Sequence, residues 1–361
     1  MKYAKVVIKI GTSVLAEENG AIDKKRIESI ASQVLGLLKK GIKVIVVSSG
    51  AIGCGMEALK LKNPPSSLSE LQATAAVGQT CLMALYSEAF GKRNFTVGQV
   101  LLTQEDFDHR LRYLNIKYTI EALLAKKIVP IVNENDTVST EEIKCGDNDR
   151  ISSLVADLSG ADLLVVLTNV DGLYDKSGKV IGTVESITPG LKKLVTKKCL
   201  SITKGGMESK IEALEVAVNS GIDCFIANGK VDNIIPAILA GSGASTYFKA
   251  KPVKRKAKKR WIAYSSKAKG KIIVDDGAKK ALCHSHRSLL SSGIIGKDGN
   301  FKAGDVVGIA DSKKKEFARG LTNYASKEIG RIKGLKTGEI EAMLGYKDHD
   351  EVVHRDNLVI L

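Results

Sequence analysis

The chain has 361 residues, a length that suggests two or three domains. Of these residues 44% are hydrophobic and 26% are charged, which is typical of a globular protein. The apolar run at the N-terminus is too short for a signal peptide, and no stretch reaches the roughly 18 apolar residues of a membrane helix. We therefore expect a cytoplasmic protein without a membrane partner. The six cysteines form no CxxC pair, which argues against a zinc cluster and a disulfide framework.

The net charge of +15 is concentrated in one segment of the sequence. Residues 249–271 contain 11 Lys/Arg and no Asp/Glu, whereas the residues on either side are nearly balanced in charge. A run of this kind usually forms a solvated linker, and we interpret residues 251–271 in that way. Binding of nucleic acid or of another anionic surface is the alternative.

Segments rich in Val and Ile alternate with helical patterns over the first 250 residues. Continuous apolar runs predict strands that are covered on both faces, at residues 5–10, 43–49, 95–102, 128–133, 162–168 and 224–229. Apolar residues spaced by three and four predict helices at 27–38, 68–90, 113–124, 151–158 and 207–218. This alternation predicts an α/β fold, with a mostly parallel open sheet and helices on both faces.

The pattern changes after the basic segment. Residues 272–361 consist of short β-like pieces that are separated by glycine and polar turns, such as "GNFKAGDVVGIA", which predicts a small β-rich domain. We therefore divide the chain into residues 1–250, a basic linker at 251–271 and a C-terminal domain at 272–361.

Two expected strands end in residues that suit a phosphate group. Lys9 precedes a turn at Gly11, and a lysine there can reach a phosphate that the backbone N–H groups cradle. The alternative is that Lys9 is a surface lysine beside a turn and has no role in binding. The next strand ends in "SSGAIGCG" (48–55), a loop of small residues that either packs closely or approaches an anion.

Three further motifs follow expected strands or precede a helix. "NENDTV" (133–138) and "TNVDGLY" (168–174) each follow a strand, where Asp and Asn are also common as plain loop residues. "KGGMESK" (204–210) places a glycine pair at a helix start with Lys210 one turn later, which suits a phosphate chain, although a flexible loop before an ordinary helix fits equally well.

The stretch "IKCGDNDRIS" (143–152) contains Asp147, Asn148 and Asp149 side by side. One of them could cap the following helix, but a cap needs a single side chain. The alternative is a binding site for a cationic group, such as lysine, ammonium or a metal. Together with two lysines and two glycine-rich loops at the same sheet edge, this cluster favours phosphoryl transfer, in which lysines neutralise charge on the moving group.

The motifs together resemble the glutamate 5-kinases, which are amino-acid kinase family enzymes with a C-terminal PUA domain. The matching stretches run through nearly the whole chain and include "KIGTSVL", "VSSGAI", "AAVGQ", "NENDTV", "GDND", "GGMESK" and "HRDNLV". The resemblance implies the amino-acid kinase fold and transfer of phosphate from ATP to the γ-carboxylate of L-glutamate, which is the first step of proline biosynthesis. It also implies Mg²⁺ carried by ATP without direct protein ligands, proline as a feedback inhibitor and a homo-oligomer.

The resemblance also implies roles for individual residues. Lys9 and Lys210 would stabilise the phosphoryl group in flight, and Asp149 would hold both lysines. The residues implied for glutamate binding are Ser49, Gly50, Ala51, Asp136, Asp147 and Asn148, of which Asp136 and the acidic cluster would receive the ammonium group. The residues implied for ATP binding are Lys9, Gly11, Thr168, Asn169, Lys204, Gly205, Gly206, Met207, Glu208, Ser209 and Lys210. Asn169, Lys204 and Arg150 depart from the usual family pattern.

Two other functions remain open at this point. Another carboxylate kinase of the same fold, such as one acting on N-acetylglutamate, would have no ammonium group for the acidic cluster to bind. An RNA-binding or regulatory protein would use the basic segment and the PUA-like domain. The near-neutral charge of residues 272–361 does not favour strong RNA binding by that domain alone.

Overall fold

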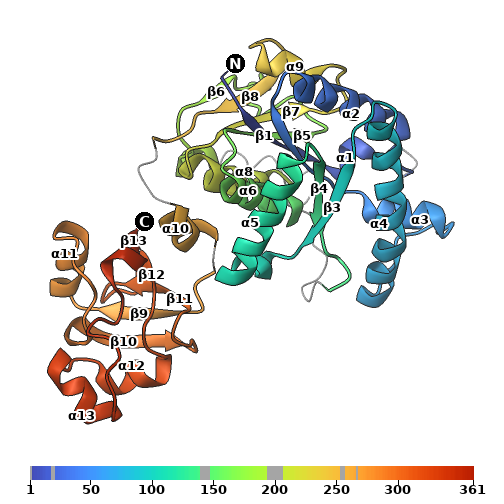
Figure 1. Ribbon diagram of the computed structural model, residues 1–361. Helices are drawn as coiled ribbons and strands as arrows, with labels where there is room; N and C mark the ends of the chain where they lie inside the picture. The colour runs from blue at the N-terminus through green and yellow to red at the C-terminus, as the bar shows by residue number, and fades with distance from the viewer. Residues whose placement is uncertain (1, 18–20, 139–146, 193–205, 253–256, 266) are drawn as a thin grey trace. The chain divides into compact units, whose positions relative to one another are not determined.

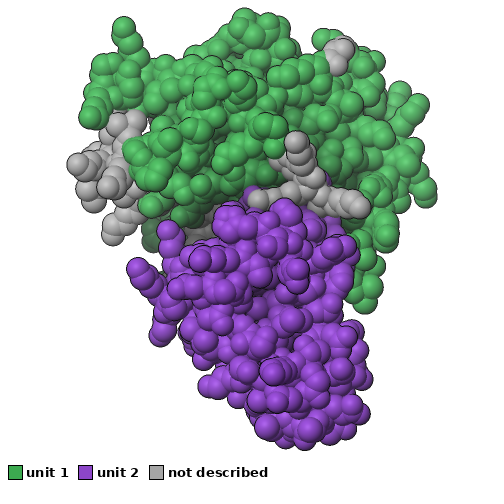
Figure 2. Space-filling view, turned by 90° about the vertical axis from the view of Figure 1, so that its left-hand side faces the viewer, with its two compact units in different colours: residues 1–253 green, residues 254–361 purple. Residues whose placement is uncertain are grey.

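The computed structural model describes residues 2–17, 21–138, 147–192, 206–252, 257–265 and 267–361. The chain forms two compact units, residues 1–253 and residues 254–361 (Figure 2). Each unit has its own sheet and its own hydrophobic core.

The first unit contains one sheet with the strand order β3-β4-β2-β1-β5-β7-β8-β6. The first six of these strands are parallel, and β8 runs antiparallel to β7. All six expected strands are therefore confirmed, as is the mostly parallel sheet. The strands are β1 (Lys5–Ile10), β2 (Lys43–Val47), β3 (Val97–Leu102), β4 (Val129–Glu134), β5 (Leu163–Thr168), β6 (Thr183–Val184), β7 (Asp223–Asn228) and β8 (Ser245–Phe248).

Helices cover both faces of this sheet, as the sequence predicts (Figure 1). All five expected helices are confirmed, and most begin a few residues earlier than their apolar pattern. The helices are α1 (Thr12–Leu15), α2 (Lys24–Lys39), α3 (Ala51–Ala58), α4 (Leu68–Gly91), η1 (Gln104–Phe107), α5 (Arg110–Ala125), α6 (Asp147–Ser159), α8 (Gly206–Asn219) and α9 (Ile234–Leu239). The early start of α2 reflects a polar cap, because the Asp23 carboxylate accepts the Arg26 N–H; at α4, which starts where its pattern starts, the Ser67 hydroxyl accepts the Glu70 N–H.

The alternation of side chains along β1 separates the two faces. Val6, Ile8 and Ile10 belong to the core cluster that also contains the apolar residues of α2, α4 and α9. Because successive side chains of a strand point to opposite faces, Val7 and Lys9 point toward the other layer, which α5, α6 and α8 form. The same alternation in β5 places Thr168 on the face of Lys9.

The segment 48–55 was expected to be a loop, and that prediction is wrong beyond Gly50. Residues Ala51–Ala58 form helix α3, which packs backbone to backbone against α4. An added Cβ on Gly55 would lie 1.9 Å from the Thr74 carbonyl oxygen, and one on Gly78 would lie 1.7 Å from the Ala51 carbonyl oxygen. These glycines therefore permit close helix packing rather than a flexible loop.

The second unit is β-rich, as the sequence predicts, with a five-stranded sheet of order β10-β9-β11-β12-β13. Its strands are β9 (Gly270–Val274), β10 (Ile294–Gly299), β11 (Val306–Ala310), β12 (Glu316–Leu321) and β13 (Leu358–Ile360). Its helices are α10 (Ala257–Arg260), η2 (Trp261–Ser265), α11 (Asp276–His284), η3 (Ser291–Gly293), α12 (Ser326–Ile332), η4 (Thr337–Glu339), α13 (Ile340–Leu344) and η5 (Arg355–Asn357).

The expectation of a solvated linker is wrong for the described part of residues 257–271. Helix α10 and the helical turn η2 belong to the second unit, and the side chains of Trp261 and Ile262 are 1% and 0% exposed. Burial of a tryptophan and an isoleucine stabilises the fold, whereas a linker would leave them in water. Because the segment carries so many positive charges, its sequence suggested an exposed linker rather than one held by the buried Trp261 and Ile262.

No helix among the described residues combines the length and the apolar character that a membrane span requires.

We predict that Gly78→Ala destabilises the protein by at least about 3 kcal/mol, because the new methyl group would collide with the backbone of α3. Gly36→Ala is the matched control, since Gly36 lies inside α2 with nothing within 4 Å of its would-be Cβ. It should stabilise the helix by up to about 1 kcal/mol. Urea unfolding measures both free energies, and a Gly78→Ala variant as stable as the wild type would contradict the close packing.

Candidate active site

Lys9 is a buried lysine at the carboxyl end of the central strand β1. It is only 4% exposed, although lysine is rarely buried without a partner. Its ammonium nitrogen lies 2.6 Å from Oδ1 of Asp149. The sequence alone left a surface lysine beside a turn as an alternative, and this burial excludes that alternative.

Asp149 lies in the first turn of α6 and is 1% exposed. The helix is held on the sheet by the buried residues Ile151, Leu154, Val155 and Leu158, which follow at helical spacing. This stripe fixes the rotation of α6, and the rotation directs Asp149 toward β1. A carboxylate in the first helical turn also interacts favourably with the positive end of the helix dipole.

Lys210 approaches the same carboxylate from helix α8, which packs against α6. Its ammonium nitrogen lies 3.1 Å from Oδ2 of Asp149 and donates a hydrogen bond of 2.8 Å to the Gly206 carbonyl oxygen. The Ser209 hydroxyl lies 3.4 Å from the same Oδ2. The structure thus brings Lys9, Asp149 and Lys210 together, one carboxylate between two lysines, and their catalytic roles stay predictions.

The two lysines determine the ionisation of Asp149. Burial by itself would raise the pKa of this carboxyl group, because a charged group is less stable away from water. The positive charges of Lys9 and Lys210, and their hydrogen bonds, outweigh burial and hold the pKa of Asp149 below its usual value. Asp149 is therefore ionised at neutral pH.

Glycines adjoin both ammonium groups. A Cβ on Gly11 would lie 3.6 Å from the Lys9 ammonium nitrogen and 3.2 Å from the Leu167 carbonyl oxygen, and one on Gly206 would lie 4.0 Å from the Lys210 nitrogen. At these two positions, therefore, no side chain of the glycine residue competes with a ligand for the space beside an ammonium group. Glycine backbone of this kind can approach a phosphate group.

Asn148, the neighbour of Asp149, makes contacts of a different kind. Its Oδ1 accepts a hydrogen bond of 3.1 Å from the backbone N–H of Glu134, and its Nδ2 donates to Asn133 Oδ1 at 2.9 Å. The same Nδ2 lies 3.3 Å from the Ser49 hydroxyl oxygen. Asn148 therefore joins the ends of β2 and β4 through neutral groups, and neither it nor Asp149 acts as a helix cap.

The other residues implied for glutamate binding lie at the same sheet edge. Ser49 is 7% exposed and precedes Gly50, whose φ of +100° is a left-handed conformation that favours glycine. Ala51 begins α3 and is buried. Asp136 is half-buried in the turn that follows β4. Asp147 begins α6, and its side chain lies outside the described residues.

The residues implied for ATP binding are described only in part. Thr168 is 5% exposed at the end of β5, on the face of Lys9, and Asn169 is exposed directly after it. Gly206 begins α8, Met207 is half-buried and Glu208 is exposed. Lys204 and Gly205 lie outside the described residues.

The sequence motifs did not single out Asn133. It is 1% exposed and contacts Asn148 directly. Its position as the first residue of "NENDTV" was the available signal, since it lies at a strand end, but only Asp136 of that motif was assigned a role. Asparagine is common in turns, and this obscured its place inside the sheet.

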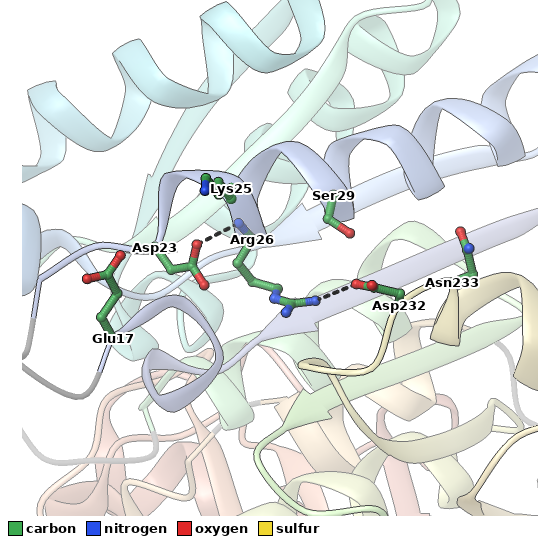
Figure 3. A pocket seen from close by; sticks show the side chains of 7 residues that line it. All are labelled: Glu17, Asp23, Lys25, Arg26, Ser29, Asp232 and Asn233. Carbon is green, nitrogen blue, oxygen red and sulfur yellow. Dashed lines mark hydrogen bonds and ion pairs between the residues drawn. The ribbon is translucent and has the colours of Figure 1, made fainter.

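A polar hollow of about 570 Å³ lies on the first unit (Figure 3), and Arg26 pairs there with Asp232 at 3.1 Å. Its lining residues are Glu17, Asp23, Lys25, Arg26, Ser29, Asp232 and Asn233. None of them belongs to the lysine–aspartate cluster or to the contacts of Asn148. We therefore assign this hollow no part in the chemistry.

We predict that Asp149→Asn lowers the free energy of unfolding at pH 7 by about 3 kcal/mol, because it leaves two buried lysines without their counter-ion. The pKa of Asp149 is lowered in the folded state, so its contribution is present above the unfolded pKa and is lost as pH falls through the folded pKa. The difference from wild type should thus be constant from pH 7 to about 4 and shrink below that.

Urea unfolding between pH 3 and pH 7 measures this difference. Glu88→Gln is the control, because Glu88 pairs with Lys92 at 3.1 Å on the exposed surface and should change stability by less than about 0.5 kcal/mol. A stability loss in Asp149→Asn that grows toward acid pH would show that the lysines do not stabilise this carboxylate.

Comparisons with known proteins show the family of the chain. The model of the Amino acid kinase family matches residues 4–228, and that of the PUA domain matches residues 270–344. A solved structure, UMP kinase from Bacillus anthracis, is 16% identical and covers 70% of this chain and 98% of that chain, but its TM-score of 0.47 is too low to carry an argument.

Several relatives are similar over nearly their full length. Glutamate 5-kinase from Thermoanaerobacter sp. (strain X514) is 45% identical, with 99% of this chain and 98% of that protein covered. Glutamate 5-kinase from Caldanaerobacter subterraneus subsp. tengcongensis is 46% identical, again with 99% and 98% covered. Glutamate 5-kinase from Moorella thermoacetica is 44% identical, with 99% and 96% covered. The chain therefore belongs to the amino acid kinase family.

Proposed function

We propose that this chain catalyses the glutamate 5-kinase reaction, in which ATP and L-glutamate give L-glutamyl 5-phosphate and ADP, the first step of proline biosynthesis. The full-length similarity to relatives of that name supports the activity. The single structural observation that carries it is the buried carboxylate of Asp149 between the ammonium groups of Lys9 and Lys210.

This arrangement answers the main difficulty of the reaction. The γ-carboxylate of glutamate has a pKa near 4 and is already a nucleophile at neutral pH, so no general base is needed. The difficulty is that an anion must attack an anionic phosphate. Two lysines fixed in advance at one point can neutralise the charge on the phosphoryl group without reorganising. Asp149 keeps the lysines in place and prevents their mutual repulsion from separating them.

Mg²⁺ would enter with the ATP phosphates, where it supplies further neutralisation of their charge. The contacts of Asp149 support binding of the ion by ATP rather than by this carboxylate, because both oxygens of Asp149 already contact lysines. A carboxylate that is engaged in this way is a poor metal ligand, so Asp149 would not hold the ion. The glycine backbone at Gly11 and Gly206 leaves space for the phosphates beside Lys9 and Lys210. Thr168, Asn169 and residues 204–210 would complete the nucleotide site.

Glutamate would bind on the side of Asn148. The amide of Asn148 and the hydroxyl of Ser49 form one polar surface at 3.3 Å from each other, which suits the carboxylate and amino groups of an amino acid. Gly50 and Ala51 would add backbone contacts, and Asp136 with Asp147 would receive the α-ammonium group. N-acetylglutamate lacks that ammonium group and would offer these carboxylates no cationic group to bind, so we favour free glutamate.

Every group assigned to the reaction lies in the first unit. The catalytic part would thus be residues 1–253, and the PUA-like part would be residues 254–361, which include helix α10 of the basic segment. Proline as a feedback inhibitor and a homo-oligomeric state are extensions of the same proposal. RNA binding by the second unit is the alternative function, and it would be sensitive to salt and independent of Lys9.

Hydroxylamine trapping tests the reaction directly, because it converts an acyl phosphate to a hydroxamate. We expect hydroxamate from ATP and L-glutamate and none above background from N-acetylglutamate. The same preparation is titrated with labelled RNA at increasing salt. No hydroxamate from either acid would refute the kinase function, and product from N-acetylglutamate alone would move the substrate to the acylated amino acid.

Lysine variants test the catalytic roles. We predict that Lys9→Ala and Lys210→Ala each lower kcat by about 100-fold to 1,000-fold, because each removes charge stabilisation from the transition state. Lys39→Ala, on the solvent side of α2, serves as the control and should retain wild-type rates. Steady-state kinetics separates kcat from KM, and a variant that changed only the KM for ATP would contradict a role in the transition state.

A further inference from the structure

A buried glutamine lies behind the contacts of Asn148. Gln79, on α4, is 8% exposed, and its Oε1 accepts a hydrogen bond of 2.8 Å from Asn133 Nδ2. Asn133 in turn contacts Asn148, which contacts Ser49. These four side chains form a continuous polar chain from the interior of the first unit to the proposed glutamate side.

One backbone group determines the direction of every bond in this chain. The N–H of Glu134 can only donate, and it lies 2.9 Å from Asn133 Oδ1 and 3.1 Å from Asn148 Oδ1. Both asparagines must therefore present oxygen to that N–H. As a result, the NH₂ group of Asn148 is directed to Ser49 and to Asn133, and the NH₂ group of Asn133 is directed to Gln79.

Gln79 must then offer its oxygen to Asn133, which leaves its NH₂ group on the opposite side. That nitrogen is buried and has no hydrogen-bond partner among the residues that the structure describes. An unsatisfied buried donor destabilises a fold, and native structures contain few of them. A methionine would fill the same volume without this penalty, so the contribution of Gln79 is its acceptor oxygen.

The position of that oxygen is fixed by the packing of α4. Gly78 precedes Gln79 and lies in backbone contact with α3, since its would-be Cβ is 1.7 Å from the Ala51 carbonyl oxygen. About two helical turns after Gln79, the buried Tyr86 hydroxyl lies 2.8 Å from the Ser48 hydroxyl, beside Ser49. Helix α4 thus supports the end of β2 and the amide chain together.

We propose that Gln79 is a positioning residue for amino-acid binding: its carbonyl oxygen orients Asn133, which presents the amide of Asn148 and the hydroxyl of Ser49 to the substrate. This inference rests on the proposed function, because that function assigns Asn148 and Ser49 to glutamate. In the part of the chain that the structure describes, Gln79 forms no hydrogen bond with Lys9, Asp149 or Lys210, which lie on the proposed nucleotide side.

Gln79→Met tests the proposal because it keeps the volume and removes the acceptor oxygen. We expect the KM for glutamate to rise about 10-fold, the KM for ATP to change less than about 2-fold and kcat to fall less than about 3-fold, as expected for loss of one orienting hydrogen bond. The melting temperature should change little, because the substitution removes one unsatisfied buried donor, the Gln79 NH₂ group, and leaves another, the Asn133 NH₂ group. Gln79→Glu retains an acceptor oxygen and should restore the KM for glutamate to within about 3-fold of wild type.

Thr74→Val is the matched control on the same helix. Thr74 is 2% exposed, and its hydroxyl donates to the Glu70 carbonyl oxygen within α4, outside the amide chain. It should leave both KM values unchanged. If Gln79→Met does not fold, Gln79→Asn replaces it, because the shorter side chain withdraws the oxygen from Asn133.

A double variant with Asn148→Ala shows whether Gln79 acts through Asn148. Its KM for glutamate should equal that of Asn148→Ala alone within about 2-fold, since nothing remains to be oriented. If the two fold-changes in the KM for glutamate multiply, or if Gln79→Met has the wild-type KM, the positioning role is overturned. The proposed function still stands in either case if the wild-type protein forms hydroxamate. Absence of hydroxamate from the wild type would instead refute the proposed function, and this inference with it.

Discussion

One buried carboxylate constrains three separate elements of the fold. Asp149 on α6 contacts Lys9 of β1 and Lys210 of α8, and all three side chains are largely removed from water. Two lysines so close together would repel each other and resist burial, so the carboxylate is the condition for their coexistence. The cluster retains one net positive charge, which is what an incoming phosphate requires. The two ion pairs therefore join β1, α6 and α8 in addition to their apolar packing.

Adjacent residues of α6 serve two different environments. Successive residues of a helix are about 100° apart around its axis, so Asn148 and Asp149 face different neighbours. Asp149 faces charged groups, whereas Asn148 faces Ser49, Asn133 and the backbone of β4. The first turn of α6 would thus lie between the charged lysine–aspartate cluster, which suits phosphate, and the uncharged side chains around Asn148, which together with Asp136 and Asp147 suit an amino acid. In this account, the acidic-looking motif is a boundary between the two halves of one site.

The sequence predicts the sheet well because buried parallel strands consist of nearly continuous runs of Val, Ile and Leu, as in β1 and β5. It predicts Lys9, Asp149 and Lys210 as site residues because charged groups at the end of a strand or the start of a helix stand out against apolar runs, and because the motifs resemble a known family. It did not single out Gln79 and Asn133, although they stand in the quoted stretches "AAVGQ" and "NENDTV", since a buried amide inside a helix or strand has no periodic signal. Gly55 suggested a loop because glycine is common in turns, but glycine is also found where two helices pack closely, as α3 and α4 do here. The eleven basic residues of segment 249–271 suggested an exposed linker, although Trp261 within it is buried.

The central claim is that Lys9 and Lys210 act as one unit on one phosphoryl group. The most direct measurement is the single-turnover rate of acyl-phosphate formation in Lys9→Met, Lys210→Met and the double variant, at saturating ATP and glutamate. The account predicts that the double variant loses far less than the product of the two single losses, because either substitution already dismantles the shared arrangement. Losses that multiply independently would show that the two lysines act at separate points, and would contradict the account.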